Sequence, residues 1–141
     1  MTASTDNCIA GGPEIVSAAR SQYDVPYSWG GGNWKGKSRG TGKGAGTVGF
    51  DCSGLAQYAV YKGTGKIIGR TAAAQSSDSQ CQRVPYSQRK PGDLVFFGTP
   101  AYHVGIISGT NTFIHAPKTG DKVRQQTIYS TNRQSYVSRC F

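Results

Sequence analysis

The sequence predicts an α+β fold, with N-terminal helices packed on an antiparallel sheet of five to six strands. Apolar residues at helical spacing occupy the first half of the chain, whereas residues with strand character dominate from Asp93 onward. The 141 residues are enough for one hydrophobic core. We expect a flexible N-terminal lead-in at 1–11. Because no repeat or linker divides the rest of the chain, we expect a single domain at 12–141.

The first helix is predicted to begin near Pro13, since proline is favoured in the first turn of a helix. Ile15, Ala19 and Tyr23 then recur at helical spacing. The helix must end before Pro26, because the residue before a proline avoids the helical conformation. This pattern predicts a short amphipathic helix with one buried face.

Two further helices are expected before the strands. One begins at Cys52, with Asp51 as its N-cap and Gly63 as its stop signal. A third helix fits residues 71–80, with Thr71 as its cap. Both are short enough to pack on one face of a sheet.

The second half of the chain predicts strands separated by turn residues. Segments rich in β-branched and aromatic residues alternate with glycine, proline and asparagine at 98–100 and 109–111. The five expected strands are 93–97, 102–108, 112–116, 122–128 and 135–141.

A glycine-rich, basic segment at 30–49 has little to bury and predicts a long loop. Residues 31–38 fit the phosphate-loop pattern GxxxxGK[ST], but that motif requires a buried strand before it and a helix after it. Neither is expected here, so we interpret the match as accidental. We hypothesise instead that aromatic and cationic side chains of the loop border a cleft and contact substrate: Trp34, Lys35, Lys37, Arg39 and Lys43.

The net charge of +9 favours binding to polyanions. Charge alone leaves nucleic acid, an anionic membrane and an anionic wall polymer open. The cations are spread along the chain and match no nucleic-acid-binding module, and no apolar run approaches the roughly 18 residues of a membrane-spanning helix. We therefore expect neither a nucleic-acid partner nor membrane insertion.

The chemistry-bearing residues are one cysteine and the only two histidines. Cys52 lies in the first turn of a predicted helix, where the helix dipole is expected to lower the thiol pKa. His103 and His115 are equidistant from Gly109, so a tight hairpin would place them side by side on one sheet face. The alternative is a buried structural thiol with two unrelated histidines. The combination favours a Cys-His-polar catalytic triad.

Five motifs, in this order, give the chain a specific family resemblance. It resembles the NlpC-type cell-wall endopeptidases, a papain-like group, and within them secreted fungal and actinobacterial members. The resemblance covers 12–141. It rests on the motifs VPYSWGG at 25–31, GFDCSGL at 49–55, PGDLVFF at 91–97, HVGI at 103–106 and FIHAP at 113–117.

The resemblance implies a role for each matching residue. Cys52 would be the nucleophile, His103 the general base and acid, and His115 the residue that orients His103. The implied substrate-binding residues are Tyr27, Trp29, Asp51 and Ser53. Tyr27 would line the site and assist the oxyanion, while Asp51 and Ser53 bind the amino end of the peptide in some members. No metal or other cofactor is implied.

The resemblance also implies a reaction, namely hydrolysis of amide bonds in the stem peptides of bacterial peptidoglycan. The expected bond joins D-γ-glutamate to a diamino acid, and it would break through a thioester acyl-enzyme. We expect a secreted monomer, with its signal peptide outside these residues, that acts on peptidoglycan or muropeptides. An antibacterial role is one biological setting. Alternatives are an amidase or acyltransferase of the same superfamily, and a catalytically silent wall-binding module.

The cysteine count then has a simple consequence. If Cys52 is the nucleophile, at most one disulfide forms among Cys8, Cys81 and Cys140. The sequence leaves the pairing open, and we expect a bridge that uses Cys8, which lies near one end of the chain.

Overall fold

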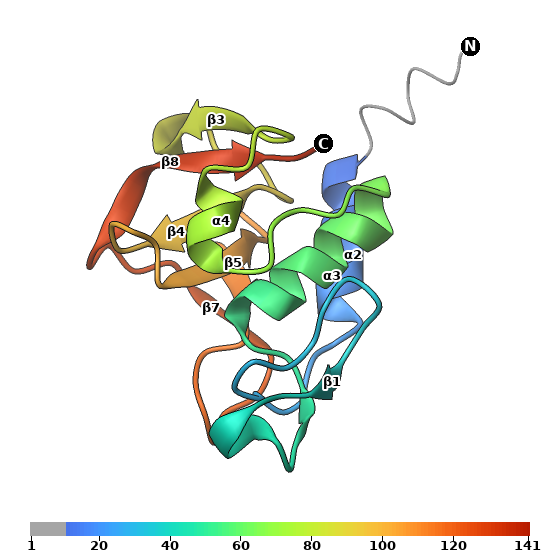
Figure 1. Cartoon of the computed structure of the whole chain (residues 1–141). Coiled ribbons are helices and arrows are strands. Elements are labelled where there is room, and N and C mark those ends of the chain that lie inside the picture. Colours follow the sequence, from blue (N-terminus) through green and yellow to red (C-terminus); the bar gives the residue numbers. More distant parts are fainter. Residues whose placement is uncertain (1–10) are drawn as a thin grey trace.

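Two helices pack side by side against one face of a six-stranded sheet in the computed structural model, which describes residues 11–141 (Figure 1). They are α2 (Gly11–Arg20) and α3 (Cys52–Thr64), and a shorter α4 (Ala72–Ser76) follows them. The predicted fold class is therefore confirmed. Of the expected flexible lead-in at 1–11, residues 1–10 lie outside the described part, and Gly11 opens α2.

The sheet is antiparallel throughout and has the strand order β3-β8-β4-β5-β6-β7. All five predicted strands are present, within three residues of their expected ends. The sixth strand, at the edge, was not among the expected segments. The bounds are β3 (Gln82–Pro85), β4 (Leu94–Phe97), β5 (His103–Ile107), β6 (Thr112–His115), β7 (Arg124–Thr127) and β8 (Arg133–Arg139).

Helix α3 begins as predicted but ends later. The Asp51 carboxylate accepts a hydrogen bond from the backbone N–H of Gly54 at 2.7 Å, which caps the helix. The C-cap is Gly65, whose φ of 80° is left-handed. Gly63 is not a stop signal, because it lies within the helix where a Cβ would approach Ile15 of α2 to 2.5 Å. It is therefore the point of close approach between α2 and α3.

Helix α4 is shorter than the predicted 71–80. Thr71 caps it as expected, since its side chain accepts a hydrogen bond from the backbone of Ala74. The helix ends at Ser76, and Asp78 then accepts hydrogen bonds from Gly69 and Gln80. These bonds satisfy the backbone in a turn rather than in a longer helix.

The hydrophobic core lies mainly between the helices and the sheet. Val104 and Ile106 of β5 face the helices, since alternate residues of a strand point to opposite faces of the sheet. The opposite face carries a smaller cluster that includes Phe97, Ile107 and Phe113. The two histidines therefore share a sheet face with aromatic residues rather than with the main core.

The hairpin register differs from the prediction by two residues. The pairs Ile106–Ile114 and Ile107–Phe113 show that the turn is not centred on Gly109. Because the shift is an even number, each side chain keeps its predicted face. His103 and His115 are consequently diagonal neighbours on one face instead of direct partners.

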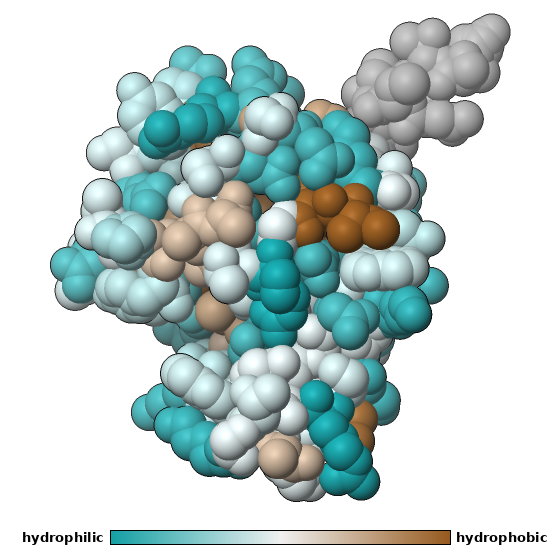
Figure 2. Space-filling model, viewed as in Figure 1, coloured by the Kyte–Doolittle hydropathy of each residue, from teal (hydrophilic) through white to brown (hydrophobic). Residues whose placement is uncertain are grey.

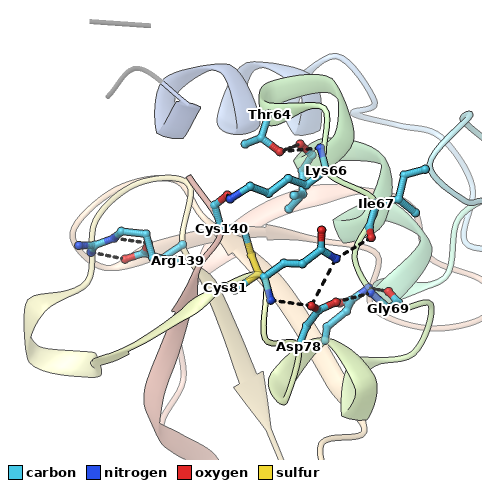
Figure 3. Close-up of a disulfide and its surroundings, with 12 residues drawn as sticks. Thr64, Lys66, Ile67, Gly69, Asp78, Cys81, Arg139 and Cys140 are labelled. Carbon is cyan, nitrogen blue, oxygen red and sulfur yellow. Dashed lines mark hydrogen bonds and ion pairs between the residues drawn. A yellow bond between two sulfur atoms is a disulfide. The ribbon is translucent and has the colours of Figure 1, made fainter. Parts of the chain in front are cut away.

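The disulfide joins Cys81 and Cys140, so the expected bridge to Cys8 is wrong (Figure 3). The two cysteines flank β3 and β8, whose neighbouring residues Gln82 and Arg139 pair in the sheet. Lys66 donates a hydrogen bond to the carbonyl of Cys140 at 3.0 Å. The bridge thus ties the edge strand to the sheet. Cys8 lies outside the described residues.

The glycine-rich segment is a folded loop rather than a phosphate-binding turn. It contains a two-stranded ribbon, β1 (Ser38–Arg39) with β2 (Val48–Gly49), and a short 3-10 turn at Gly42–Gly44. No helix follows 31–38. The buried Ser28 hydroxyl lies within hydrogen-bond reach of the carbonyls of Gly44 and Thr47 and holds the loop to the body.

This loop and the loop after β6 form the lower lobe of the molecule (Figure 1). The surface narrows above that lobe, and the visible face is mainly hydrophilic (Figure 2). Within 11–141, no helix has both the length and the apolar character needed to cross a membrane.

Candidate active site

Cys52 lies where two hollows of the surface meet. The larger hollow, of about 640 Å³, contains Cys52 together with His103 and His115. The smaller one, of about 320 Å³, extends past Asp51 and Ser53 to the start of α4. The structure thus brings all seven predicted site residues to one cleft. The residues that line both hollows are Tyr27, Trp29, Cys52 and Tyr102.

The two histidines form a hydrogen-bonded pair inside this cleft. Nε2 of His103 lies 2.8 Å from Nδ1 of His115, and both side chains are buried. Nε2 of His115 in turn lies 2.7 Å from Oε1 of Gln126, on β7. Burial lowers the pKa of each histidine to about 4, so both rings are neutral near pH 7. A neutral ring can accept a proton, as a general base must.

The thiol pKa moves in the opposite direction from the prediction. Burial raises the pKa of Cys52 to about 11, and the negative charge of Asp51 adds to the rise. Backbone hydrogen bonds lower it, one from Ser53 in the first turn of α3 and one from Val104 of β5, but they are outweighed. In the resting site the sulfur is therefore a neutral thiol. Its proton must be removed during attack, by a neighbouring base.

Tyr27 projects into both hollows beside the sulfur. Burial raises the pKa of its hydroxyl to about 12, and the negative charge of Asp51, with that of Cys52 when the thiol is ionised, acts in the same direction. The hydroxyl therefore stays protonated at any physiological pH and remains a hydrogen-bond donor. A donor beside the nucleophile can stabilise an oxyanion.

Asp51 and Ser53 are held by a cation that the sequence did not reveal. Arg70 forms an ion pair with Asp51 at 3.0 Å and donates a hydrogen bond to the Ser53 hydroxyl at 2.8 Å. It also donates to the carbonyl of Gly31, which links the glycine-rich loop to the helix start. Gln75 of α4 donates to the carbonyl of Ser53. These contacts fix the wall of the smaller hollow.

The glycine-rich loop contributes to the cleft through one of its four cations. Lys43 lines the larger hollow and lies over the ring of Trp29, 4.8 Å from its centroid. Trp34 instead packs edge-on against Tyr61 of α3, and Lys35 lies over Trp34. Neither hollow is lined by any of the other predicted contact residues of the loop, which are Trp34, Lys35, Lys37 and Arg39. The hypothesis that the whole loop contacts substrate is thus narrowed to Lys43.

The structure brings two further polar residues to the histidines that the motifs did not indicate. Gln126 and Arg124 lie on β7, a strand made only of polar residues. Arg124 donates to Oε1 of Gln126 at 2.9 Å and pairs with Asp121 at 3.3 Å. All four residues of β7 are polar, so no apolar alternation in the sequence indicates which of them face His115. In the part of the chain that the structure describes, no group of three or more acidic, histidine or cysteine residues is suited to hold a metal ion.

Comparison with known proteins agrees with this geometry. Residues 24–140 match the model of the NlpC/P60 family. The chain is 40% identical, over 126 residues, to the peptidoglycan endopeptidase RipA of Mycolicibacterium smegmatis, covering 89% of this chain and 25% of that protein. It is 32% identical, over 136 residues, to the gamma-D-glutamyl-L-lysine dipeptidyl-peptidase of Bacillus subtilis, covering 91% of this chain and 40% of that one. The chain thus spans only part of the length of these relatives.

Solved structures show the same fold. The peptidoglycan hydrolase RipB of Mycobacterium tuberculosis superposes with a TM-score of 0.87 at 34% identity, covering 99% of this chain and 68% of that one. RipD of the same species is described as a non-catalytic NlpC/p60 domain protein adapted to peptidoglycan binding. It superposes with a TM-score of 0.83 at 32% identity, covering 93% of this chain and 98% of that one. The family match over 24–140, with the cysteine and histidines in one cleft, establishes that the chain belongs to the NlpC/P60 family.

Proposed function

We propose that the chain is a cysteine peptidase that hydrolyses the amide between D-γ-glutamate and a diamino acid in peptidoglycan stem peptides. The single observation that carries the proposal is that Cys52, His103 and His115 line one hollow, with the histidines 2.8 Å apart. A thiol that needs a base to ionise lies beside a neutral imidazole that can serve as that base. The names of relatives at 32% and 40% identity supply the substrate class.

In the proposed reaction, His103 takes the thiol proton as the sulfur of Cys52 attacks the amide carbonyl. The carbonyl oxygen becomes an oxyanion, which the backbone N–H groups at the start of α3 and the Tyr27 hydroxyl stabilise. The protonated His103 then gives its proton to the leaving nitrogen, and the thioester remains on Cys52. Water, activated by the same imidazole, releases the glutamyl carboxylate and restores the thiol.

The position of the proton donor indicates which half of the substrate each hollow would bind. Because His103 must protonate the leaving amine, the diamino acid belongs in the larger hollow, which contains both histidines. The glutamyl side then belongs in the smaller hollow, beside Ser53. We retain Asp51, Ser53, Tyr27 and Trp29 as substrate-binding residues on this basis.

The charge of the larger hollow suits such a leaving group. Its cationic lining residues are Lys43, Lys118 and Arg124, and no carboxylate is among the residues that line it. The leaving peptide carries free carboxylates, which cations attract. This complementarity also favours a wall substrate over a neutral peptide. We further propose that the protein is secreted, is a monomer and has an antibacterial role.

Product analysis with soluble muropeptides tests the proposal. Wild-type protein should release a fragment whose new N-terminus is the diamino acid, and Cys52→Ala should release none. Mass spectrometry of the fragments identifies the bond. If the wild type releases no more than Cys52→Ala while both bind insoluble wall, the chain is a binding module, as RipD is described to be. A product in which an added amine replaces water would indicate an acyltransferase instead.

A further inference from the structure

We propose that Arg124 and Gln126 are positioning residues that fix which nitrogen of each catalytic histidine carries the proton. The inference rests on the proposed cysteine-peptidase function and extends it to two residues of β7. It is built on a continuous chain of side chains from Asp121 to His103. The links are Asp121–Arg124 at 3.3 Å, Arg124–Gln126 at 2.9 Å, Gln126–His115 at 2.7 Å and His115–His103 at 2.8 Å.

The second side chain of this series, Arg124, can only donate hydrogen bonds. A guanidinium has five N–H donors and no acceptor, so the Gln126 atom that faces Arg124 must be the amide oxygen. If the amide turned over, its NH₂ would face the N–H of Arg124, and both donors would lack a partner. Asp121 holds Arg124 from the other side through two contacts of 3.3 Å. Arg124 therefore sets the orientation of the Gln126 amide.

The amide oxygen then sets the first histidine. Oε1 of Gln126 has two lone pairs, one for Arg124 and one for Nε2 of His115. Nε2 of His115 must consequently carry the proton and donate it. In the neutral ring the other nitrogen, Nδ1, is then an acceptor.

The second histidine follows from the first. Nδ1 of His115 accepts, so Nε2 of His103 must carry the proton that bridges the two rings. The remaining nitrogen of His103, Nδ1, is left with a lone pair. This nitrogen is the one available to take the proton of Cys52. The opposite tautomer would present N–H to the thiol, and a ring in that form cannot act as a base.

If the Gln126 amide turns over, the donor and acceptor roles of both histidines should therefore be reversed. In Arg124→Met the Gln126 amide is free to turn and donate to Nε2 of His115. Nδ1 of His115 would then donate to Nε2 of His103, leaving Nδ1 of His103 protonated. Gln126→Glu in the same background should prevent this, because an ionised carboxylate has no N–H to present. A merely structural role for Arg124 predicts no such rescue.

Nitrogen NMR of the histidine rings tests the tautomers directly. The protein has two histidines, so long-range ¹H–¹⁵N spectra of uniformly labelled protein contain only four ring nitrogens. At pH 7.5 we expect both rings of the wild type as the neutral Nε2–H form. In Arg124→Met we expect a substantial Nδ1–H population in both rings, and in Arg124→Met/Gln126→Glu a return to Nε2–H.

Kinetics on muropeptides give the matching functional result. We expect kcat to fall at least about tenfold in Arg124→Met, since outer partners of catalytic groups contribute roughly 10- to 100-fold. The double variant should recover most of that loss, whatever the change in KM. Arg83→Met, which removes a cation on the distant strand β3, should leave kcat unchanged.

Two results would overturn the inference. One is a wild-type ring in the Nδ1–H form. The other is an Arg124→Met spectrum in which both rings keep the Nε2–H form. The spectra need no substrate, so they decide the tautomers even if the protein proves unable to cleave muropeptides. Failure of the proposed function and failure of this inference are thus distinguishable.

Discussion

The histidine pair of the cleft and the far edge of the sheet at β3 are held by different bonds. At the edge, the Cys81–Cys140 disulfide and an ion pair of 2.7 Å between Arg139 and the buried Asp93 join elements distant in sequence. At the cleft, hydrogen bonds between side chains hold the histidines. The contrast indicates that the β3 edge of the sheet stabilises the fold, whereas the cleft holds the neutral groups that transfer protons in the proposed reaction.

Substitution of the nucleophile should separate the two regions most strongly. We expect Cys52→Ala to reduce kcat/KM on muropeptides by more than about 10³-fold, because no other nucleophile replaces the thiol. The free energy of unfolding should stay within about 1 kcal/mol of wild type, since the side chain is small and partly exposed. Steady-state kinetics and urea unfolding check both statements. A large loss of stability would show that the cleft also holds the fold together.

Removal of the disulfide should produce the opposite pattern. The bridge closes a separation of 59 residues, and the variant Cys81→Ala/Cys140→Ala should lose about 2–4 kcal/mol of unfolding free energy. Below the lowered unfolding transition, kcat should remain close to that of the wild type, because the bridge lies at the far edge of the sheet. Urea unfolding and kinetics at 15 °C measure the two effects. A fall in kcat as large as that of Cys52→Ala would contradict the separation.

The histidines should make stability depend on pH. Their pKa falls from 6.5 in the unfolded chain to about 4 in the fold. As pH decreases below 6.5, the unfolded chain binds protons first, so this stability is present above pH 6.5 and is lost towards pH 4. His103→Gln/His115→Gln should flatten the profile. Urea unfolding from pH 8 to 4 gives the comparison, and parallel profiles for the two proteins would refute the assignment.

The cations of the larger hollow should have the smallest effect. Lys43→Ser/Lys118→Ser should raise KM for muropeptides about three- to tenfold with kcat almost unchanged, since exposed charges contribute about 1 kcal/mol or less. The effect should shrink as salt is added. Lys62→Ser, which removes a cation of α3 remote from the cleft, is the control. An equal rise in KM for both variants would mean that net charge, not the hollow, attracts the substrate.

Local rules were enough to predict most of the frame. Helix α3 starts where its cap Asp51 predicts, and the two histidines share a face because the register differs from the predicted one by an even number of residues. Strand β3 was missed because Val84 is its only buried residue, so it carries no apolar alternation. Without β3 the nearness of Cys81 to Cys140 was hidden, and the bridge was assigned to Cys8 instead.

The finer features of the site depend on packing between distant segments. The pKa of Cys52 was predicted to fall from its helix position alone, but burial and Asp51 exceed that local effect. Arg70 reaches Asp51 across 19 positions of sequence, and Gln126 reaches His115 through the pairing of β6 with β7. Sequence spacing shows neither contact. The motifs thus revealed the reacting atoms, and the structure revealed what orients them.

Cleavage of an intact muropeptide in ¹⁸O-enriched water shows both which bond is hydrolysed and whether Cys52 is the nucleophile. We expect one ¹⁸O atom in the γ-carboxylate of the glutamyl fragment, a diamino acid fragment with a free α-amine, and no fragments with Cys52→Ala. Fragments cut at another bond, or formed equally by Cys52→Ala, would contradict this expectation.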